Sequence, residues 1–304
     1  MHVLKMVSDT NFQRVDKRKF VSDTIFGHVT IVGLGLIGGS LGLALRRRRL
    51  ASEVVGLSHR LATLRVAKRR GAIDWGTTDP QAAVAGADLV ILATPVDLIV
   101  PAARRLARFL PTGAVLTDVG GTKARVVRTL DCALPPGLAF VGAHPLAGSE
   151  QRGIAAARAD LFDGSVCILT PTPRTPRPAL AAVARLWRPL AGRVIRMSPE
   201  AHDRALAETS HLPHVMAACL ALAGARAPLA GAVPSFLAMT RVAKSDSELW
   251  DDIFFTNTAP VLAAMDRYAG VWRRLRALLA GKRRAELRRA LHLARTRRIA
   301  LDGR

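Results

Sequence analysis

The sequence predicts an α/β protein in which an N-terminal Rossmann-type parallel sheet domain is followed by an all-α domain. One observation is a glycine-rich turn between a predicted buried strand and a predicted helix, in residues 28–50, HVTIVGLGLIGGSLGLALRRRRL. A second is the alternation of short apolar runs with helical periodicity as far as about residue 170, as in successive βα units. The third is helical periodicity alone near the C-terminal end. A chain of 304 residues is long enough for two cores.

The predicted boundaries follow this pattern. Residues 1–27 are polar, charged and aperiodic, which predicts a loose N-terminal extension. We expect the sheet domain to span residues 28–197 and the helical domain residues 198–304. A proline-rich connector, PTPRTPRP at residues 171–178, follows the last predicted βα unit.

The glycine turn has the G-x-G-x-x-G spacing of a dinucleotide-binding site. The first glycine permits the tight turn, the second lets the backbone approach a pyrophosphate, and the third lets the helix pack closely on the strand. The N-terminus of the helix then presents free N–H groups to the phosphates. Because a strand precedes the turn and a second strand follows at residues 53–57, we favour a cofactor site over a chance glycine cluster. The predicted cofactor contacts here are Gly33, Gly35, Leu36, Ile37 and Gly38.

The end of the second predicted strand bears on the choice between NAD and NADP. An Asp or Glu at this place bonds the ribose 2′-hydroxyl of NAD, but the chain has Ser58, His59 and Arg60. An arginine and a hydroxyl suit a 2′-phosphate, which favours NADP, with NAD kept as the alternative. In the other interpretation, Arg60 simply begins a solvated helix.

The rest of the sheet domain is predicted from apolar runs and helical spacing. Residues 87–94, ADLVILAT, contain the most hydrophobic strand signal in the chain, and this apolar run predicts burial on both faces of a parallel sheet. Thr94 and Pro95 follow at its carboxyl end, where open α/β sheets bind ligands, so we expect both to contact the cofactor. The other expected helices are 61–70, 96–109, 123–130 and 179–190, and the other expected strands are 114–118, 138–141 and 193–197.

The predicted helical domain begins with a long helix at residues 202–223, in which Pro213 predicts a kink. Helices of this kind commonly pair subunits in two-domain dehydrogenases. The arginine-rich region from Val271 onward predicts an amphipathic helix with a solvated face rather than an effector site.

The amino-acid composition limits the classes of partner and the cellular compartment that we expect. The net charge is +22, which raises nucleic acid as a partner, but the arginines are spread along the chain, so we expect solvated helix faces and no nucleic-acid binding. The three cysteines are far apart, as in a protein of a reducing compartment. The absence of a long apolar run predicts no membrane span or signal peptide, and hence a cytoplasmic protein.

Histidines are the candidate proton acceptors. His144 lies in the glycine-flanked stretch GAHPLAG, after a predicted strand and beside the expected nicotinamide position, where an imidazole can accept a proton as a hydride leaves. The alternative is a histidine that merely caps a turn. His202, His211 and His214 fall near one stripe of a helix, but no H-E-x-x-H or cysteine accompanies them. We therefore expect a substrate pocket and no metal.

Several stretches together resemble the prephenate and arogenate dehydrogenase family of tyrosine biosynthesis. The resemblance covers roughly residues 27–266. It implies a Rossmann domain followed by a helical dimerisation domain, a homodimer, and oxidative decarboxylation of prephenate or arogenate by hydride transfer to NAD or NADP. The stretches are GLGLIGGSLGLAL, LATP, TDVGGTK, GAHPLAGSEQRGIAAARADLFDG, MSPEAHDRALAETSHLPH and TRVAKSDSELWDDI.

The resemblance also implies roles for particular residues. His144 matches the histidine that bonds the substrate hydroxyl and assists its deprotonation, and Arg241 matches an arginine that binds a substrate carboxylate. The residues that match the lining of the substrate pocket are His202, His211, His214 and Trp250.

Two departures from the family pattern stand out. Gly121 occupies the place of a serine that hydrogen-bonds the substrate hydroxyl, and Thr122 beside it is the candidate to compensate in catalysis. Ala238 replaces a usual aspartate. These departures keep open the alternative of a catalytically weakened cofactor-binding homologue. Among enzymes, the alternative is another two-domain dehydrogenase with a Rossmann N-terminal half and a helical C-terminal half.

Overall fold

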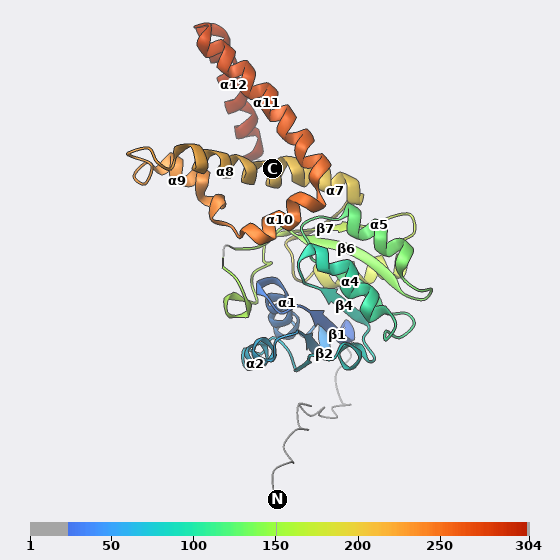
Figure 1. Ribbon diagram of the computed structural model, residues 1–304. Coiled ribbons are helices and arrows are strands. Elements are labelled where there is room, and N and C mark those ends of the chain that lie inside the picture. Colours follow the sequence, from blue (N-terminus) through green and yellow to red (C-terminus); the bar gives the residue numbers. More distant parts are fainter. Residues whose placement is uncertain (1–23, 150, 303–304) are drawn as a thin grey trace, which may run out of the picture.

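The computed structural model describes residues 24–149 and 151–302, so most of the predicted extension, residues 1–23, lies outside the described residues. The first strand begins at Phe26, which means that residues 26 and 27 belong to the sheet and not to an extension. The chain forms a sheet domain followed by a helical part that lies on one side of it (Figure 1). The predicted α/β fold class is confirmed.

The sheet has eight strands in the order β3-β2-β1-β4-β5-β6-β7-β8. Every neighbouring pair is parallel except β6 and β7, which are antiparallel. The order reverses direction between β1 and β4, which is the switch point where open parallel sheets bind ligands. The strands are β1 Phe26–Val32, β2 Ala51–Leu57, β3 Trp75–Thr77, β4 Leu89–Leu92, β5 Val115–Asp118, β6 Ala139–Pro145, β7 Val166–Thr170 and β8 Arg193–Arg196.

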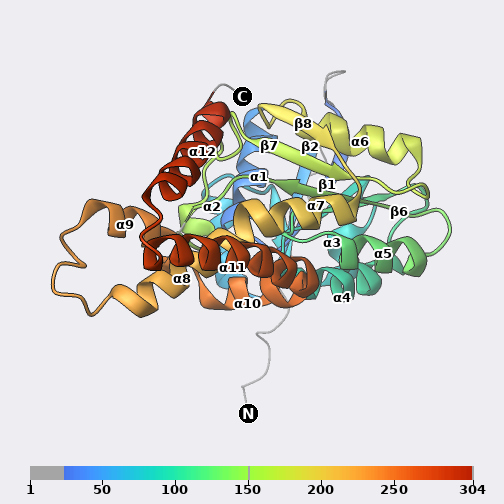
Figure 2. The same ribbon diagram turned by 90° about the horizontal axis from the view of Figure 1, so that it is seen from above.

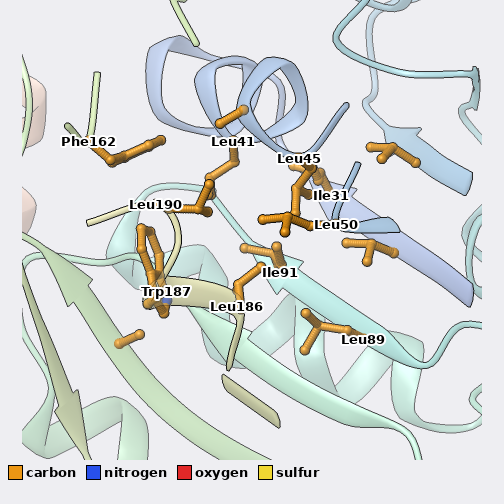
Figure 3. Close-up of a cluster of buried hydrophobic side chains, with 14 of the residues drawn as sticks. Ile31, Leu41, Leu45, Leu50, Leu89, Ile91, Phe162, Leu186, Trp187 and Leu190 are labelled. Atoms are coloured by element: carbon orange, nitrogen blue, oxygen red, sulfur yellow. The ribbon is translucent and has the colours of Figure 1, made fainter. Parts of the chain in front are cut away.

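Helices cover both faces of this sheet (Figure 2). On one face, α1 and α6 pack over side chains of β1 and β4 such as Ile31 and Ile91, together with the buried Trp187 (Figure 3). On the other face, α3, α4 and α5 pack over Val90 and Leu92. The alternation within β4 confirms the prediction of burial on both faces. The helices are α1 Leu36–Arg47, α2 Leu61–Arg69, α3 Pro80–Val84, α4 Val96–Ala107, α5 Ala124–Ala133 and α6 Arg177–Trp187.

Three elements of the sheet domain were missing from the prediction: β3, α3 and β7. The first two are only three and five residues long, too short for a clear period. The strand β7 breaks the βα pattern, because the described residues between 146 and 165, all but residue 150, contain only a 3₁₀ turn, Ile154–Ala156, in place of a crossover helix. Without a crossover helix the chain returns antiparallel to β6.

The helical part begins with an irregular helix. The predicted helix 202–223 is divided into α7, a π-helical segment Ala207–His211, and α8, with Pro213 in the first turn of α8. Proline has no N–H to donate to the preceding turn, so the irregularity lies before it, close to the predicted kink. The remaining elements are α7 Pro199–Leu206, α8 Leu212–Gly224, α9 Pro234–Thr240, a 3₁₀ turn Arg241–Lys244, α10 Ser247–Thr256, α11 Thr258–Ala280 and α12 Arg284–Asp302.

The helices α11 and α12 form an antiparallel pair that extends away from the sheet domain (Figure 1). Large apolar side chains are exposed along them, including Trp272 at 57% and Ile299 at 54%. The region from Val271 onward is helical as predicted, but its surface is more apolar than a purely solvated face. Within the described residues, no helix is both long and apolar enough to cross a membrane.

Candidate active site

The turn after β1 has the geometry of a phosphate cradle. Gly33 has φ +90°, a conformation that side chains other than glycine rarely adopt. A Cβ on Gly38 would lie 2.0 Å from the Gly33 carbonyl oxygen, so only glycine allows α1 to pack this close to β1. In the part of the chain that the structure describes, no atom lies within 4 Å of a Cβ added at Gly35, and no side chain caps the N-terminus of α1. The N–H groups there are thus available to a pyrophosphate.

A buried polar atom at the end of β4 also fits a bound nucleotide. Thr94 follows β4, and its hydroxyl is buried with no hydrogen-bond partner among the described residues. Pro95 is the N-cap residue of α4. Both residues lie where β1 and β4 diverge, next to the glycine turn. A buried hydroxyl without a partner among the described residues, at this edge of the sheet, is suited to a ligand that accepts or donates a hydrogen bond.

At the end of β2, the three residues considered for cofactor choice lie close together. The Nε of Arg60 donates to Nε2 of His59 at 3.0 Å, and the Arg60 backbone N–H donates to Oγ of Ser58 at 3.2 Å. Arg60 is also the N-cap residue of α2, so it both ends the β2 loop and begins a helix. The exposed guanidinium and imidazole form a basic corner at this edge of the sheet.

His144 is the second-last residue of β6, and its ring is hydrogen-bonded to a residue of the helical part. Its Nδ1 lies 2.9 Å from Nε2 of His202 on α7, and the two rings meet edge to face. His202 Nδ1 in turn lies 2.7 Å from Oδ1 of Asp203. The Asp203 carboxylate also accepts the backbone N–H groups of Lys123 and Ala124, both at 2.8 Å, at the start of α5. A chain of hydrogen bonds therefore runs from β6 through α7 to α5.

A buried ion pair supports the loop between β5 and α5. Lys123 Nζ pairs with the Asp118 carboxylate, and both side chains are fully buried. The same carboxylate accepts the N–H of Gly120 at 2.9 Å and of Ala143 at 3.2 Å, which ties the end of β5 to β6 beside His144. Neither Lys123 nor Asp118 was among the predicted site residues, although both belong to the stretch TDVGGTK.

Burial keeps these histidines neutral. The pKa of His144 is lowered well below 6.5, first by burial and then by electrostatic interaction with His202 and with the ammonium group of Lys123. The pKa of His202 is lowered as well, because burial outweighs its hydrogen bond to Asp203. A neutral imidazole has a free lone pair, so His144 in this form is able to accept a proton.

The other predicted pocket residues come from four neighbouring elements: His211 from the π-helical segment, His214 from α8, Arg241 from the 3₁₀ turn after α9, and Trp250 from α10. His214 stacks on Trp250 with ring centroids 3.4 Å apart, and His211 meets the edge of the same indole. His211 Nδ1 accepts a hydrogen bond from Nδ2 of Asn257 at 3.1 Å. Asn257 was not among the predicted site residues. Burial lowers the pKa of both histidines to about 4, and for His214 the nearby charge of Arg241 contributes. The exposed Arg241 thus lies near His214.

Thr122 faces a different element. Its hydroxyl lies 2.9 Å from Oγ1 of Thr256 at the end of α10, and the side chain is buried. Thr256 Oγ1 itself donates to the Asp252 carbonyl at 2.6 Å, so Thr122 supplies the proton of the bond between them. At the neighbouring Gly121, an added Cβ would meet Ile253 at 3.5 Å, an ordinary contact. The site therefore has room for the serine side chain that the family pattern places there.

Comparison with known proteins identifies both parts of the chain. A family model described as prephenate dehydrogenase, nucleotide-binding domain matches residues 41–196, and one described as prephenate dehydrogenase, dimerization domain matches residues 198–293. A cyclohexadienyl dehydrogenase of Zymomonas mobilis is 38% identical over 269 residues, 85% of this chain and 90% of the relative. A prephenate dehydrogenase of Bacillus subtilis is 34% identical over 247 residues, 79% of this chain and 67% of the relative.

Solved structures agree with these sequence matches. Prephenate dehydrogenase from A. aeolicus, in complex with hydroxyphenyl propionate and NAD⁺, has a TM-score of 0.83 at 32% identity and covers 90% of this chain and 98% of its own. Arogenate dehydrogenase from Synechocystis has a TM-score of 0.78 at 30% identity, and the match covers 89% of this chain and 98% of the Synechocystis chain. By contrast, a 3-hydroxyisobutyrate dehydrogenase of Salmonella typhimurium, at 15% identity, shares the fold alone. A nucleotide-binding sheet domain with a histidine at the edge of β6, joined to a matching dimerization domain, places this chain in the prephenate/arogenate dehydrogenase family of enzymes.

Proposed function

We propose that this protein oxidises and decarboxylates a cyclohexadienol of the prephenate and arogenate type, with His144 as the proton acceptor. The observation that carries the proposal is the position of His144 near the carboxyl end of β6, at the same edge of the sheet as the phosphate cradle, where burial lowers its pKa well below 6.5 and so favours the neutral imidazole. A nicotinamide held by the glycine turn would supply the acceptor for the hydride from the hydroxyl-bearing ring carbon. His144 takes the hydroxyl proton, and loss of CO₂ from the opposite carbon makes the ring aromatic.

We assign the substrate pocket to the side chains between β6, α8 and α10. Arg241 is positioned to bind a carboxylate, since its guanidinium offers a planar fork of N–H donors. The stacked pair His214 and Trp250 offers a flat wall to a ring, with His211 at its edge. We also propose that the sheet domain ends at residue 197 and the helical domain begins at residue 198. The proposed pocket then lies between the two domains, since β6 belongs to the first and α8 and α10 belong to the second.

The experiment that tests this function is a steady-state matrix of two substrates against two cofactors. Prephenate and arogenate both carry the ring carboxylate and differ at the keto or amino group of the side chain. The named relatives include a prephenate, an arogenate and a cyclohexadienyl dehydrogenase, so turnover of at least one substrate is expected. Absence of turnover with both substrates and both cofactors would overturn the proposal.

Cofactor choice gives a prediction at Arg60. We expect NADP to be used at least as well as NAD, because the basic corner after β2 suits a 2′-phosphate. Arg60→Ala is expected to raise the KM for NADP by roughly 10- to 150-fold, the equivalent of about 1.5–3 kcal/mol for a charge-assisted bond, with little change for NAD. Arg65→Ala, an exposed arginine one turn further along α2, is the matched control. Equal effects on both cofactors would leave Arg60 as a solvated residue at a helix start.

The departure at position 121 gives a second prediction. Gly121→Ser is expected to raise kcat by about two- to tenfold, because it adds a hydroxyl beside the reacting oxygen, and a hydrogen bond contributes about 0.5–1.5 kcal/mol. Gly121→Ala adds the same Cβ without the hydroxyl and serves as the control. A gain in both variants would indicate packing against Ile253 rather than hydrogen bonding. No gain in either would mean that Thr122 or water already fills the role.

We further propose that the protein is a homodimer paired through its helical part. The family model that matches residues 198–293 is described as a dimerization domain. Large apolar side chains on this part are exposed in the single chain, for example Leu222 at 86% and Phe255 at 72%. Burial of such a surface against a second copy would remove the apolar area from water.

A further inference from the structure

We propose that His202 and Asp203 are positioning residues that hold His144 in one tautomer, with its proton on Nδ1 and the lone pair of Nε2 directed to the substrate. The inference rests on the proposed role of His144 as proton acceptor. It assigns His202 a task different from the substrate contact that the family resemblance implies.

The carboxylate of Asp203 is held in place by the N-terminus of α5. It accepts two backbone N–H groups, from Lys123 and Ala124, at the N-terminus of this ten-residue helix. The positive end of the helix favours the ionised carboxylate. An ionised carboxylate only accepts hydrogen bonds. The bond of 2.7 Å between Asp203 Oδ1 and His202 Nδ1 therefore requires the proton to be on His202 Nδ1.

The proton on His202 Nδ1 determines which nitrogen of His144 carries a proton. A neutral ring with a proton on Nδ1 has a lone pair on Nε2. His202 Nε2 lies 2.9 Å from Nδ1 of His144, so His144 must donate from Nδ1. Its own Nε2 then carries the lone pair, and none of the hydrogen bonds of the described residues engages that atom. The lowered pKa values of both rings are consistent with two neutral imidazoles.

Burial excludes a direct role of His202 in binding. Its relative exposure is 0%, and both ring nitrogens are bonded within the protein, one to Asp203 and one to His144. No polar atom of the ring remains for a substrate. His144 is only partly buried and reaches the edge of the sheet.

The arrangement has a consequence for the reaction. When the substrate hydroxyl loses its proton to His144 Nε2, the ring becomes an imidazolium that still donates from Nδ1 to His202. A bound nicotinamide would accept the hydride, and the electron pair of the bond to CO₂ would enter the ring. The phenolate oxygen that results takes the proton back from His144 Nε2, so the phenol forms, the base is neutral again, and charge and atoms balance. The carboxylate of Asp203 behind His202 stabilises the cation that forms, as the aspartate of a Ser-His-Asp triad does.

The direct test is ¹⁵N NMR of the histidine side chains in the wild-type protein near pH 7.5. The chain has eight histidines, and the signals of His144 and His202 are assigned by their loss in His144→Asn and His202→Leu. Both are expected as Nδ1–H tautomers, which free histidine disfavours. A proton on Nε2 of His144 would overturn the proposal. This result does not depend on turnover, so it is separable from a failure of the proposed function.

Kinetics of matched variants give the second test. Asp203→Ala and His202→Leu are expected to lower kcat by about tenfold or more, with substrate KM and NAD⁺ affinity changed by about twofold at most. His202→Gln keeps an acceptor toward His144 and is expected to recover much of the activity. The control is Ser198→Ala, which removes the N-cap hydrogen bond of α7 but no bond to either histidine.

Three kinetic outcomes would contradict the inference. A raised KM with normal kcat in His202→Leu would make His202 a substrate contact. An equal loss in Ser198→Ala would assign the effect to stability of α7. Wild-type kcat in both Asp203→Ala and His202→Leu would leave the hydrogen-bond chain without a role. If Asp203→Ala does not fold, His202→Leu and the wild-type spectrum still decide.

Discussion

His144→Asn is expected to lower kcat by about a hundred- to ten-thousandfold, the usual contribution of a general base. Asparagine has a size close to that of the imidazole but no lone pair basic enough to take a proton from the substrate hydroxyl. The phosphate cradle at Gly33 and Gly35 lies on other strands and loops, so cofactor binding is expected to stay at the wild-type level. The measurement is steady-state kcat together with the dissociation constant for NAD(P)⁺. A wild-type kcat would remove His144 from the mechanism.

The pH profile of the wild type provides an independent check on the same residue. Burial lowers the pKa of His144 well below 6.5, so the ring stays neutral as the pH falls through the normal range of histidine. Protonation of the base at still lower pH removes its lone pair. We therefore expect kcat/KM to be level around neutral pH and to fall only well below pH 6.5. A fall of kcat/KM on the acid side centred at pH 6.5 or above would contradict a lowered pKa of His144.

Arg241→Ala is expected to raise the KM for the substrate by roughly 10- to 150-fold, with a smaller change in kcat. A charge-assisted bond to a carboxylate contributes about 1.5–3 kcal/mol, and it is lost equally from the ground and transition states. Arg241 is exposed in the 3₁₀ turn after α9, so truncation opens no cavity in a core.

The matched control is Lys244→Ala, which removes one positive charge from the same turn. A similar rise in KM for Lys244→Ala would indicate a general effect of charge on an anionic substrate rather than a specific contact. Arg241→Lys keeps the charge but not the planar fork, and an intermediate KM is expected. An unchanged KM in Arg241→Ala would contradict the proposed role.

Much of the sheet domain was predictable because its signals are local. The spacing of Gly33, Gly35 and Gly38 identified the cofactor turn, because the tight turn and the close packing of the helix on the strand require glycine at fixed positions within these six residues. The apolar run of β4 predicted burial on both faces, and the pattern of hydrogen-bonded helices followed from periodicity within single segments. His144 was also identified from its neighbours, as a histidine at the end of a strand.

The partners of His144 were not visible in the sequence. His202 is 58 residues further along, and Asp203 is 80 residues beyond Lys123, whose N–H it accepts. The sequence placed His202, His211 and His214 near one stripe of a helix, whereas the structure separates them. His202 is bonded to His144, and the other two histidines meet Trp250. The π-helical segment before Pro213 changes the direction of the side chains between them.

The sequence by itself determined the class of fold, the turn that cradles the cofactor and the residue types available for catalysis, because these depend on contacts within a single strand, turn or helix. The tertiary structure decided which of those residues act together. It placed β7 antiparallel to β6, set α7 against α5, and joined His144, His202 and Asp203 by two hydrogen bonds. Such contacts depend on how separate elements pack in space, and the periodicity of residues along the chain does not predict that packing.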